Sequence, residues 1–495
     1  MNAIRHLCFQ LIIHLWDELW RSLKFVPYHH TDCLMYRNYL IAFLFILSSF
    51  TGRAQTLTLK EALNAGLNNY GTIRAKNNYI KASQEALSQT KRDYIPNVVL
   101  SAQQDYGTVN GQNGPLYGYG GFAVASSGLP LSQQNWNAGF GALYLANINW
   151  DVYTFGRTKN RINVAKATVQ RDLNDLEQEQ FQHQVRIAAT YLNLLAAQRI
   201  TIAQQKNLDR ARTFQRTSAS RASSGLVAGV DSTFANAEVS RAKIALTNAY
   251  NIVQEQNTQL AVLTGLPDRD FVLDSGFVSR IPAAIADTFY SKERYHPILK
   301  YYQSRIDMSD WQTKYYKKFY YPTISLFGII QERGSGFDAT YTQNQTNYTQ
   351  DYGQGVKPTR GNYLLGVGMN WNLTTITRNV KQVKSQKYIS DAMQDEYDLQ
   401  NQQLKAQSVL ADQKIRNAMN NYKEVPVQLK SASDAYLQKN TLYKNGLTTL
   451  VDVTQTLYLL NRAETDRDIV YNNVWQALLL KAAATGDLSI FLNEF

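Results

Sequence analysis

Few side chains in this sequence have the types and spacing that catalysis or metal binding requires. Its 495 residues include two cysteines, Cys8 and Cys33, and six histidines. Four of the histidines lie in the same N-terminal stretch as the cysteines: His6, His14, His29 and His30. The other two, His183 and His296, are far apart, and the sequence has no Gly-x-Ser-x-Gly elbow, paired-histidine zinc motif or phosphate-binding loop. We therefore predict no catalytic residue, no metal site and no cofactor.

The N-terminal stretch has the pattern of an export signal. In residues 35–54 a lone arginine precedes an apolar run, and two small residues come shortly before Gln55. This order is typical of a cleaved secretory signal peptide, and the apolar run is short for a membrane-spanning helix. We interpret residues 1–34 as a translated leader or a mis-set start, and the alternative is a cytoplasmic extension on a signal anchor. Cleavage before Gln55 would remove both cysteines, so the mature chain would have no disulfide, thiolate nucleophile or Cys/His zinc site.

The sequence contains a tandem duplication, which determines where the remaining chemistry can lie. The turn "GLVAGVDS" at Gly225 returns as "GLTTLVDV" at Gly446, and the offset in numbering is 221. The same offset relates "NWDVYTFGR" from Asn149 to "NWNLTTITR" from Asn370. Further upstream, "KRDYIP" and "KKFYYP" have an offset of 226, so the segment between these markers varies in length, as a surface loop can. We predict two structural repeats.

Each repeat is predicted to contain a helix, two strands joined by a long loop, a long helix, a glycine tip and a returning helix. In the first repeat, 55–275, the strands are 96–106 and 140–154, the loop 107–139, the long helix 157–224, the tip 225–229 and the returning helix 230–264. In the second, 276–495, the strands are 322–332 and 362–373, the loop 333–361, the long helix 374–445, the tip 446–450 and the returning helix 451–485. Pro426 should kink or break the second long helix, whereas its counterpart in the first repeat is Gln205.

The predicted strands alternate between apolar and polar residues. In residues 140–152 the even positions are apolar, whereas odd positions towards the end are Asn147, Asn149 and Asp151. Strands of about ten residues with one apolar and one polar face are typical of a membrane barrel with a wet interior, and a half-buried soluble sheet would alternate in the same way. Tyrosines and lysines near the proline ends of the strands suit a lipid headgroup layer, and the long loops suit the extracellular end of a barrel.

The long helices and the few strands together indicate an oligomer. Residues 157–224 contain no glycine or proline and would extend about 100 Å as a helix, with apolar residues spaced as in a coiled coil. Four strands cannot close a barrel, and an open sheet edge cannot lie in lipid. We therefore predict a homotrimer with a twelve-stranded transmembrane β-barrel over an α-helical periplasmic tunnel.

This layout resembles the TolC-type outer-membrane efflux protein family over the whole mature chain. The resemblance is carried by "GLVAGVDSTFANAEVSRAKIAL", "YKNGLTTLVDVTQTLYLLNRAETD", the two "NW" strand ends and "LTLKEALN". It implies a passive channel in the bacterial outer membrane that extends into the periplasm. Such a channel receives cargo from an inner-membrane pump through a periplasmic adaptor (membrane fusion) protein, in a tripartite efflux or type I secretion system.

The resemblance also implies roles for residues at the two tips. The residues that match the family's adaptor-docking tips are Gly225, Leu226, Val227, Gly446 and Leu447. Those that match its gate or constriction are Asp231, Tyr443 and Asp452. Thr448 stands where the family's gate has an arginine and Gln455 where it has a second acid, so the charge-assisted gate link is missing. Asp231 and Asp452 are also explained as first-turn residues that favour a helix N-terminus.

Three other classes of function compete with a channel: a nucleic-acid-binding protein, an enzyme and a structural coiled-coil protein. The chain carries a formal charge of +12, and its basic residues are scattered rather than gathered in a nucleic-acid motif, so no nucleic-acid partner is predicted. An outer-membrane hydrolase would need a catalytic motif that the sequence lacks. A non-transport periplasmic coiled-coil protein would explain the helices but not the duplicated strands and loops.

Overall fold

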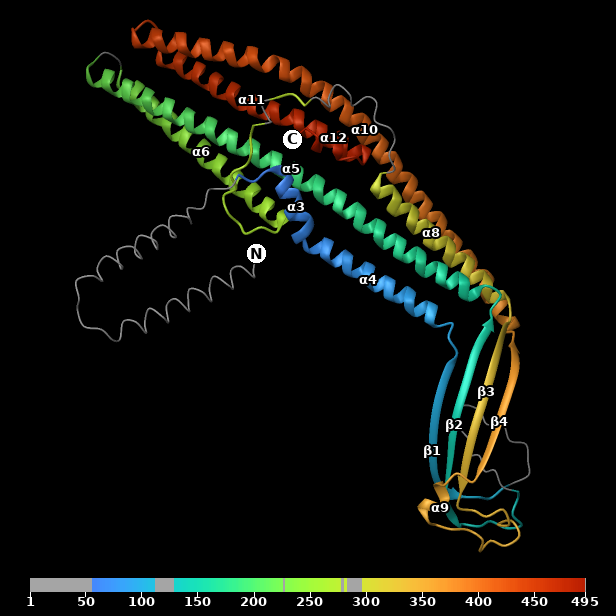
Figure 1. Ribbon diagram of the computed structural model, residues 1–495. Coiled ribbons are helices and arrows are strands. Elements are labelled where there is room, and N and C mark those ends of the chain that lie inside the picture. Colours follow the sequence, from blue (N-terminus) through green and yellow to red (C-terminus); the bar gives the residue numbers. More distant parts are fainter. Residues whose placement is uncertain (1–55, 112–128, 226–227, 277–279, 283–295, 495) are drawn as a thin grey trace, which may run out of the picture. The chain divides into compact units, whose positions relative to one another are not determined.

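The structure is a computed structural model of the chain, and it describes residues 56–111, 129–225, 228–276, 280–282 and 296–494 (Figure 1). The chain divides into two units, Met1–Thr56 and Leu57–Phe495, and every helix and strand below lies in the second. The predicted leader (1–34), the predicted signal peptide (35–54) and the tip residues Leu226 and Val227 lie outside the described residues.

Four antiparallel strands form one sheet in the order β1-β2-β3-β4. They are β1 (Asn97–Thr108), β2 (Ala138–Tyr153), β3 (Thr323–Ser335) and β4 (Arg360–Asn370). The bounds expected from the sequence differ from these by at most three residues at any end. In this single chain β1 is exposed along its whole length and β4 along nearly all of it, whereas β2 and β3 are partly covered. The two edge strands therefore have an open side each.

The register of the sheet repeats with the duplication. Leu100 of β1 lies opposite Ala146 of β2, and Leu326 of β3 lies opposite Val367 of β4. The numbering of the second pair exceeds that of the first by 226 on one strand and by 221 on the other, which are the two offsets of the sequence. The β2–β3 pairing joins the repeats, with Trp150 opposite Leu326. Both hairpins thus have the same register.

In each repeat a long helix follows the hairpin and a shorter helix returns beside it from the tip (Figure 1). These pairs are α5 (Arg157–Ser223) with α6 (Gly229–Thr264), and α10 (Leu373–Lys444) with α11 (Leu450–Thr485). The other helices are α3 (Leu59–Asn69), α4 (Gly71–Arg92), α8 (Pro297–Lys317), η2 (Lys318–Tyr320), α9 (Tyr352–Val356) and α12 (Ser489–Leu492). None of the helices in the described residues combines the length and the hydrophobicity of a membrane-spanning helix.

Local sequence explains where several helices begin. Thr58 and Glu61 form a capping box at the start of α3, since each side chain accepts a hydrogen bond from the other residue's backbone N–H. Thr449 and Asp452 form a second capping box at the start of α11. Pro426 does not break α10, because the helix continues through the proline to Lys444, and a kink there stays a prediction.

The largest hydrophobic core lies where α3, α5, α6, α11 and α12 pack together. Its fully buried aromatic residues are Tyr191 of α5, Trp475 of α11 and Phe491 of α12. Burial of each ring removes a large apolar area from water, which stabilises the folded chain by about 25 cal/mol per Å² of apolar surface. Smaller clusters, rich in alanine, follow the helix pairs towards the tips. The two repeats are therefore joined by a common core rather than folded as separate domains.

Candidate channel tips and docking surface

Both tips turn on a glycine with left-handed backbone. Gly225 has φ +68° and Gly446 has φ +77°, values that residues with a side chain rarely adopt. At the second tip the N–H of Leu447 donates to the carbonyl of Leu442 (2.9 Å), which closes the last turn of α10. The Leu447 side chain is 72% exposed. An exposed leucine adds nothing to the turn itself, so it is available for contact with another protein.

Tyr443 is the buried centre of the second tip. It is only 2% exposed and packs in a cluster with Phe214, Ala235, Leu450 and Val453, which come from α5, α6 and α11. Its hydroxyl lies 3.2 Å from Oγ of Ser218 on α5. Tyr443 thus joins the two helix pairs near their tips.

Arg221 of α5 binds the end of α10. Its guanidinium donates to the backbone carbonyls of Tyr443 and Lys444, the latter at 3.3 Å, and lies 5.0 Å from the centre of the Tyr443 ring. The last carbonyls of a helix lack intrahelical donors and carry partial negative charge, so a cation is favourable there. The arginine that holds the second tip in this chain therefore comes from the first repeat.

The two tip aspartates have different surroundings. Asp231 lies half-buried in the first turn of α6, and within the described residues no hydrogen bond or ion pair joins it to Tyr443. Asp452 accepts a hydrogen bond from Thr448 Oγ1 (2.6 Å) and lies 3.8 Å from Nζ of Lys439. The hydrogen bonds from Thr448 and then Thr449 hold the pKa of Asp452 below its ordinary value, so this carboxylate is ionised at neutral pH.

A second charged contact between the repeats lies farther from the tips. The guanidinium of Arg210 on α5 forms a two-pronged ion pair with the carboxylate of Glu464 on α11, with one prong at 3.0 Å. Both side chains are about four-fifths covered, so water screens the pair less than it would on the surface. Together with Arg221, Arg210 fixes the first helix pair against the second.

Two buried histidines hold the far ends of the returning helices. Nε2 of His183 lies 2.9 Å from the carbonyl of Leu263 in α6, and Nε2 of His296 lies 2.9 Å from the carbonyl of Ala483 in α11. Since a carbonyl only accepts, Nε2 carries the proton in both rings. Nδ1 of His296 accepts from the N–H of Ile298 (3.2 Å) and so caps α8. Burial lowers the pKa of both histidines, which favours the neutral form of each ring at neutral pH.

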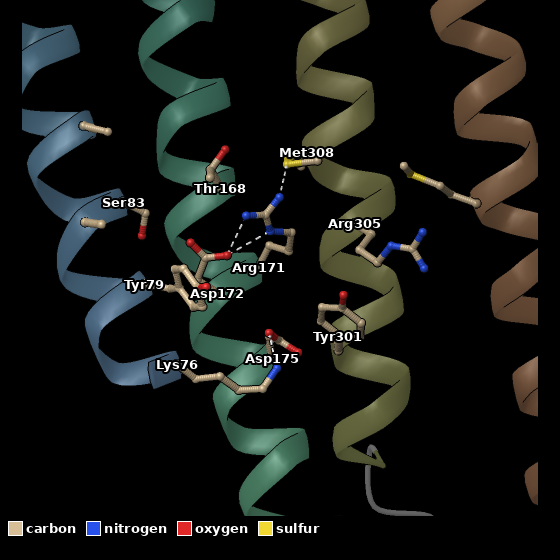
Figure 2. A pocket seen from close by; sticks show the side chains of 13 residues that line it. Lys76, Tyr79, Ser83, Thr168, Arg171, Asp172, Asp175, Tyr301, Arg305 and Met308 are labelled. Atoms are coloured by element: carbon tan, nitrogen blue, oxygen red, sulfur yellow. Dashed lines mark hydrogen bonds and ion pairs between the residues drawn. The ribbon is translucent and has the colours of Figure 1, made fainter. Parts of the chain in front are cut away.

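A cavity of about 620 Å³ lies among α4, α5, α8 and α10. Figure 2 shows the side chains that line it. Its charged groups are paired with one another: Lys76 with Asp175 (2.6 Å), and Arg171 with Asp172 (2.6 Å). Arg305 is paired with Glu396 (2.6 Å). Because these charges are balanced, the cavity does not define an anion or cation site. Among the described residues, moreover, no group of three His, Cys, Asp or Glu side chains could hold a metal ion.

Pattern reasoning from the sequence did not identify Arg210, Ser218, Arg221 or Glu464. Each acts across the two repeats, and residues such as Arg210 and Glu464 are 254 positions apart. One signal was available, since an arginine near the end of a helix that precedes a glycine tip is well placed to bind a neighbouring helix end.

Paired helices attached to an open four-stranded sheet define a class of outer-membrane channel, and comparisons with known proteins agree. Residues 62–266 match the sequence pattern of the family described as outer membrane efflux protein. This match covers less than half of the chain, and it agrees with the resemblance that the sequence predicted. The match begins in α3 and ends just after α6, so it covers the helices and strands of the first repeat. The family consists of efflux channels rather than enzymes.

Solved outer-membrane channels have the same fold. CmeC of Campylobacter jejuni is 14% identical with a TM-score of 0.69, covering 86% of this chain and 85% of that one. VceC of Vibrio cholerae is 14% identical with a TM-score of 0.67, covering 87% and 96%. The open state of MtrE of Neisseria gonorrhoeae is 15% identical with a TM-score of 0.64, covering 87% and 89%. A search of curated proteins found no match to the sequence of this chain.

Proposed function

We propose that three copies of this chain form the outer-membrane channel of a tripartite efflux or type I secretion system. The channel is a passive duct that receives cargo from an inner-membrane pump through a periplasmic adaptor. The observation that carries this proposal is the four-stranded sheet with two open edges, attached to long helix pairs in a chain whose first repeat matches an outer membrane efflux protein family. Open edges cannot lie in lipid, so the sheet needs further copies to close.

The first test is the native mass of the mature chain extracted from outer membranes in mild detergent. A trimer is expected, because three sheets supply twelve strands. A monomer or dimer would contradict closure across chains, and a non-transport periplasmic coiled-coil protein would then explain the helices better.

The adaptor is proposed to dock on the tips Gly225–Val227 and Gly446–Leu447. Leu447 supports this proposal because it is exposed next to a turn that does not need it. The double change Leu226→Asp with Leu447→Asp should reduce export at least tenfold, since a charge replaces apolar contact area at both tips. Leu447→Met, which keeps an apolar side chain of similar volume, should export normally.

Native mass separates docking from folding in this experiment. The aspartate variant is expected to remain a trimer in the outer membrane. Normal export by that variant would rule out docking through these leucines.

A further inference from the structure

The two open edges of the sheet define how neighbouring copies pair. We propose that β4 of one copy pairs antiparallel with β1 of the next in one specific register, with Asn370 opposite Ser101 and Tyr363 opposite Thr108 of the neighbouring copy. This inference rests on the proposed trimer and adds the residue contacts that would close it. The partner is a second copy of this chain.

The register follows from the duplication. Adding the sequence offsets, 226 for β1 and 221 for β2, to the numbering of the first hairpin reproduces the second, as Leu100–Ala146 becomes Leu326–Val367. The repeats are therefore equivalent in register and not only in sequence. If all repeats in the ring are equivalent, the junction between two copies has the same strand pairing as the junction between the two repeats of one chain. The second repeat of one copy then pairs with the first repeat of the next copy.

The β2–β3 pairing supplies that junction. Within the chain, Trp150 lies opposite Leu326 and Asn147 lies opposite Ile329. Adding 221 to a residue number in β2 gives the equivalent residue in β4. Subtracting 226 from a residue number in β3 gives the equivalent residue in β1, here β1 of the next copy. The pair Asn147–Ile329 then becomes Gly368 opposite Gln103. The whole overlap is residues 363–370 of β4 opposite residues 101–108 of β1.

The side chains agree with this register independently of the arithmetic. On β4 the apolar residues Tyr363, Leu365, Val367 and Met369 are at odd positions, and they alternate with Leu364, Gly366 and Gly368. On β1 the even positions Leu100, Ala102 and Tyr106 continue the apolar face of β2, and the polar residues Gln104 and Thr108 lie on the same face. The proposed register places odd residues of β4 opposite even residues of β1, so the more apolar faces of the two strands lie on the same side of the sheet. A slip of one residue would place that face against Ser101, Gln103 and Asp105.

Exposure supports the same partner. β1 is exposed at every residue, and so are most residues of β4, although these strands have the composition of their covered counterparts β3 and β2. Long exposed edges with apolar residues are templates for pairing with another chain. The edge that matches each of them in length and alternation is the other edge of the same sheet.

Paired cysteines can test the register, because the sequence has no cysteine after Cys33. Gly368→Cys is suitable, since a Cβ there would be 3.7 Å from the Phe327 ring, whereas at Gly366 it would be 2.4 Å away. Across the sheet Gln103 aligns with Arg360 of β4, so Gly368 of the same chain lies three strands away and eight residues further along. The two positions are roughly 30 Å apart, which is too far for a disulfide. A bond between them therefore joins two copies.

The variant Gly368→Cys with Gln103→Cys, oxidised in outer membranes, should give covalent trimers on a non-reducing gel. Matched controls combine Gly368→Cys with Ser101→Cys or with Asp105→Cys, which represent slips of two residues that keep the faces. We expect at least tenfold less cross-linking in both controls. A second pair, Ala102→Cys with Met369→Cys, tests the same register on the opposite face of the sheet.

The outcomes distinguish the register from the proposed function. Stronger cross-linking in a slipped control would overturn the register and leave the trimer standing. A trimeric native mass without cross-linking in any pair would overturn pairing of β1 with β4. A monomeric native mass without cross-linking would contradict the proposed channel itself.

Discussion

Arg221 joins the two repeats at a single helix end. Replacing it by alanine would leave the carbonyls of Tyr443 and Lys444 without this donor, at a cost of about 1 kcal/mol for a half-exposed charged hydrogen bond. We expect Arg221→Ala to make cells more sensitive to large antibiotics that the outer membrane normally excludes, because the tips separate more readily.

Arg221→Lys is the matched control for this prediction. Lysine keeps the charge but lacks the planar fork of donors, so an intermediate sensitivity is expected. If Arg221→Ala cells remain as resistant as cells with the unchanged channel, the contact has no part in keeping the tips together.

His296 makes stability depend on pH. Burial holds its pKa below the ordinary value of 6.5, and its Nδ1 must stay unprotonated to accept from Ile298. As pH falls below 6.5 the unfolded chain binds a proton that the folded chain resists, so the stabilisation present above pH 6.5 is lost. His183 acts in the same direction. The melting temperature should therefore fall between pH 7.5 and pH 5.

A double variant assigns this acid sensitivity. His296→Asn keeps a side-chain acceptor for the start of α8, and His183→Leu introduces the residue found at the equivalent position of the second repeat, Leu404. The pH dependence of the melting temperature in mild detergent should be smaller in this variant. An unchanged dependence would mean that other groups cause the acid sensitivity.

At the scale of elements, periodicity and glycine spacing predicted the four strands and the long helices closely. The alternation of apolar and polar residues predicted the strands, because the two faces of a strand have different surroundings. The long stretches with little or no glycine and proline predicted the helices. The contacts between repeats could not be predicted in this way. Glu464 and Arg210 are partners only because α11 packs beside α5, and periodicity within one helix contains no information about its neighbour. The tip roles taken from the family resemblance stay predictions.

Pro426 gives a prediction about α10. The helix continues through this exposed residue although proline cannot donate a hydrogen bond to the carbonyl of Tyr422. Proline inside a helix costs about 3 kcal/mol relative to alanine. Pro426→Gln, which introduces the first repeat's residue, should raise the melting temperature.

The reciprocal change is the control. Gln205→Pro in α5 should lower the melting temperature, since it removes a hydrogen bond from an unbroken helix. A lower melting temperature in Pro426→Gln would show that α10 is adapted to the proline.

For the whole molecule, three copies of Asp452 would place three carboxylates at one level of the proposed channel. Hydrogen bonds from Thr448 and Thr449 lower the pKa of each, which opposes their mutual repulsion and keeps them ionised at neutral pH. Asp452→Asn should therefore reduce the cation selectivity of the reconstituted channel, measured as a reversal potential closer to zero in a salt gradient. Asp452→Glu should retain the selectivity, and unchanged selectivity in the asparagine variant would limit Asp452 to helix capping.

The constant register of the sheet also limits what could pass. Leu100 of β1 lies opposite Ala146 of β2, and Ala146 lies opposite Ile330 of β3. Ile330 is equivalent to Gln104 of the first repeat, so crossing one repeat shifts the paired position by four residues along the strand. Six repeats would give a stagger of roughly 24 residues and a ring about 30 Å across between backbones. Side chains narrow that aperture further. An α-helix about 10 Å wide fits. A folded 100-residue domain does not, because its radius of gyration of about 13 Å corresponds to a diameter of roughly 34 Å. The ring would thus be a sieve that admits small molecules and unfolded chains and retains folded proteins.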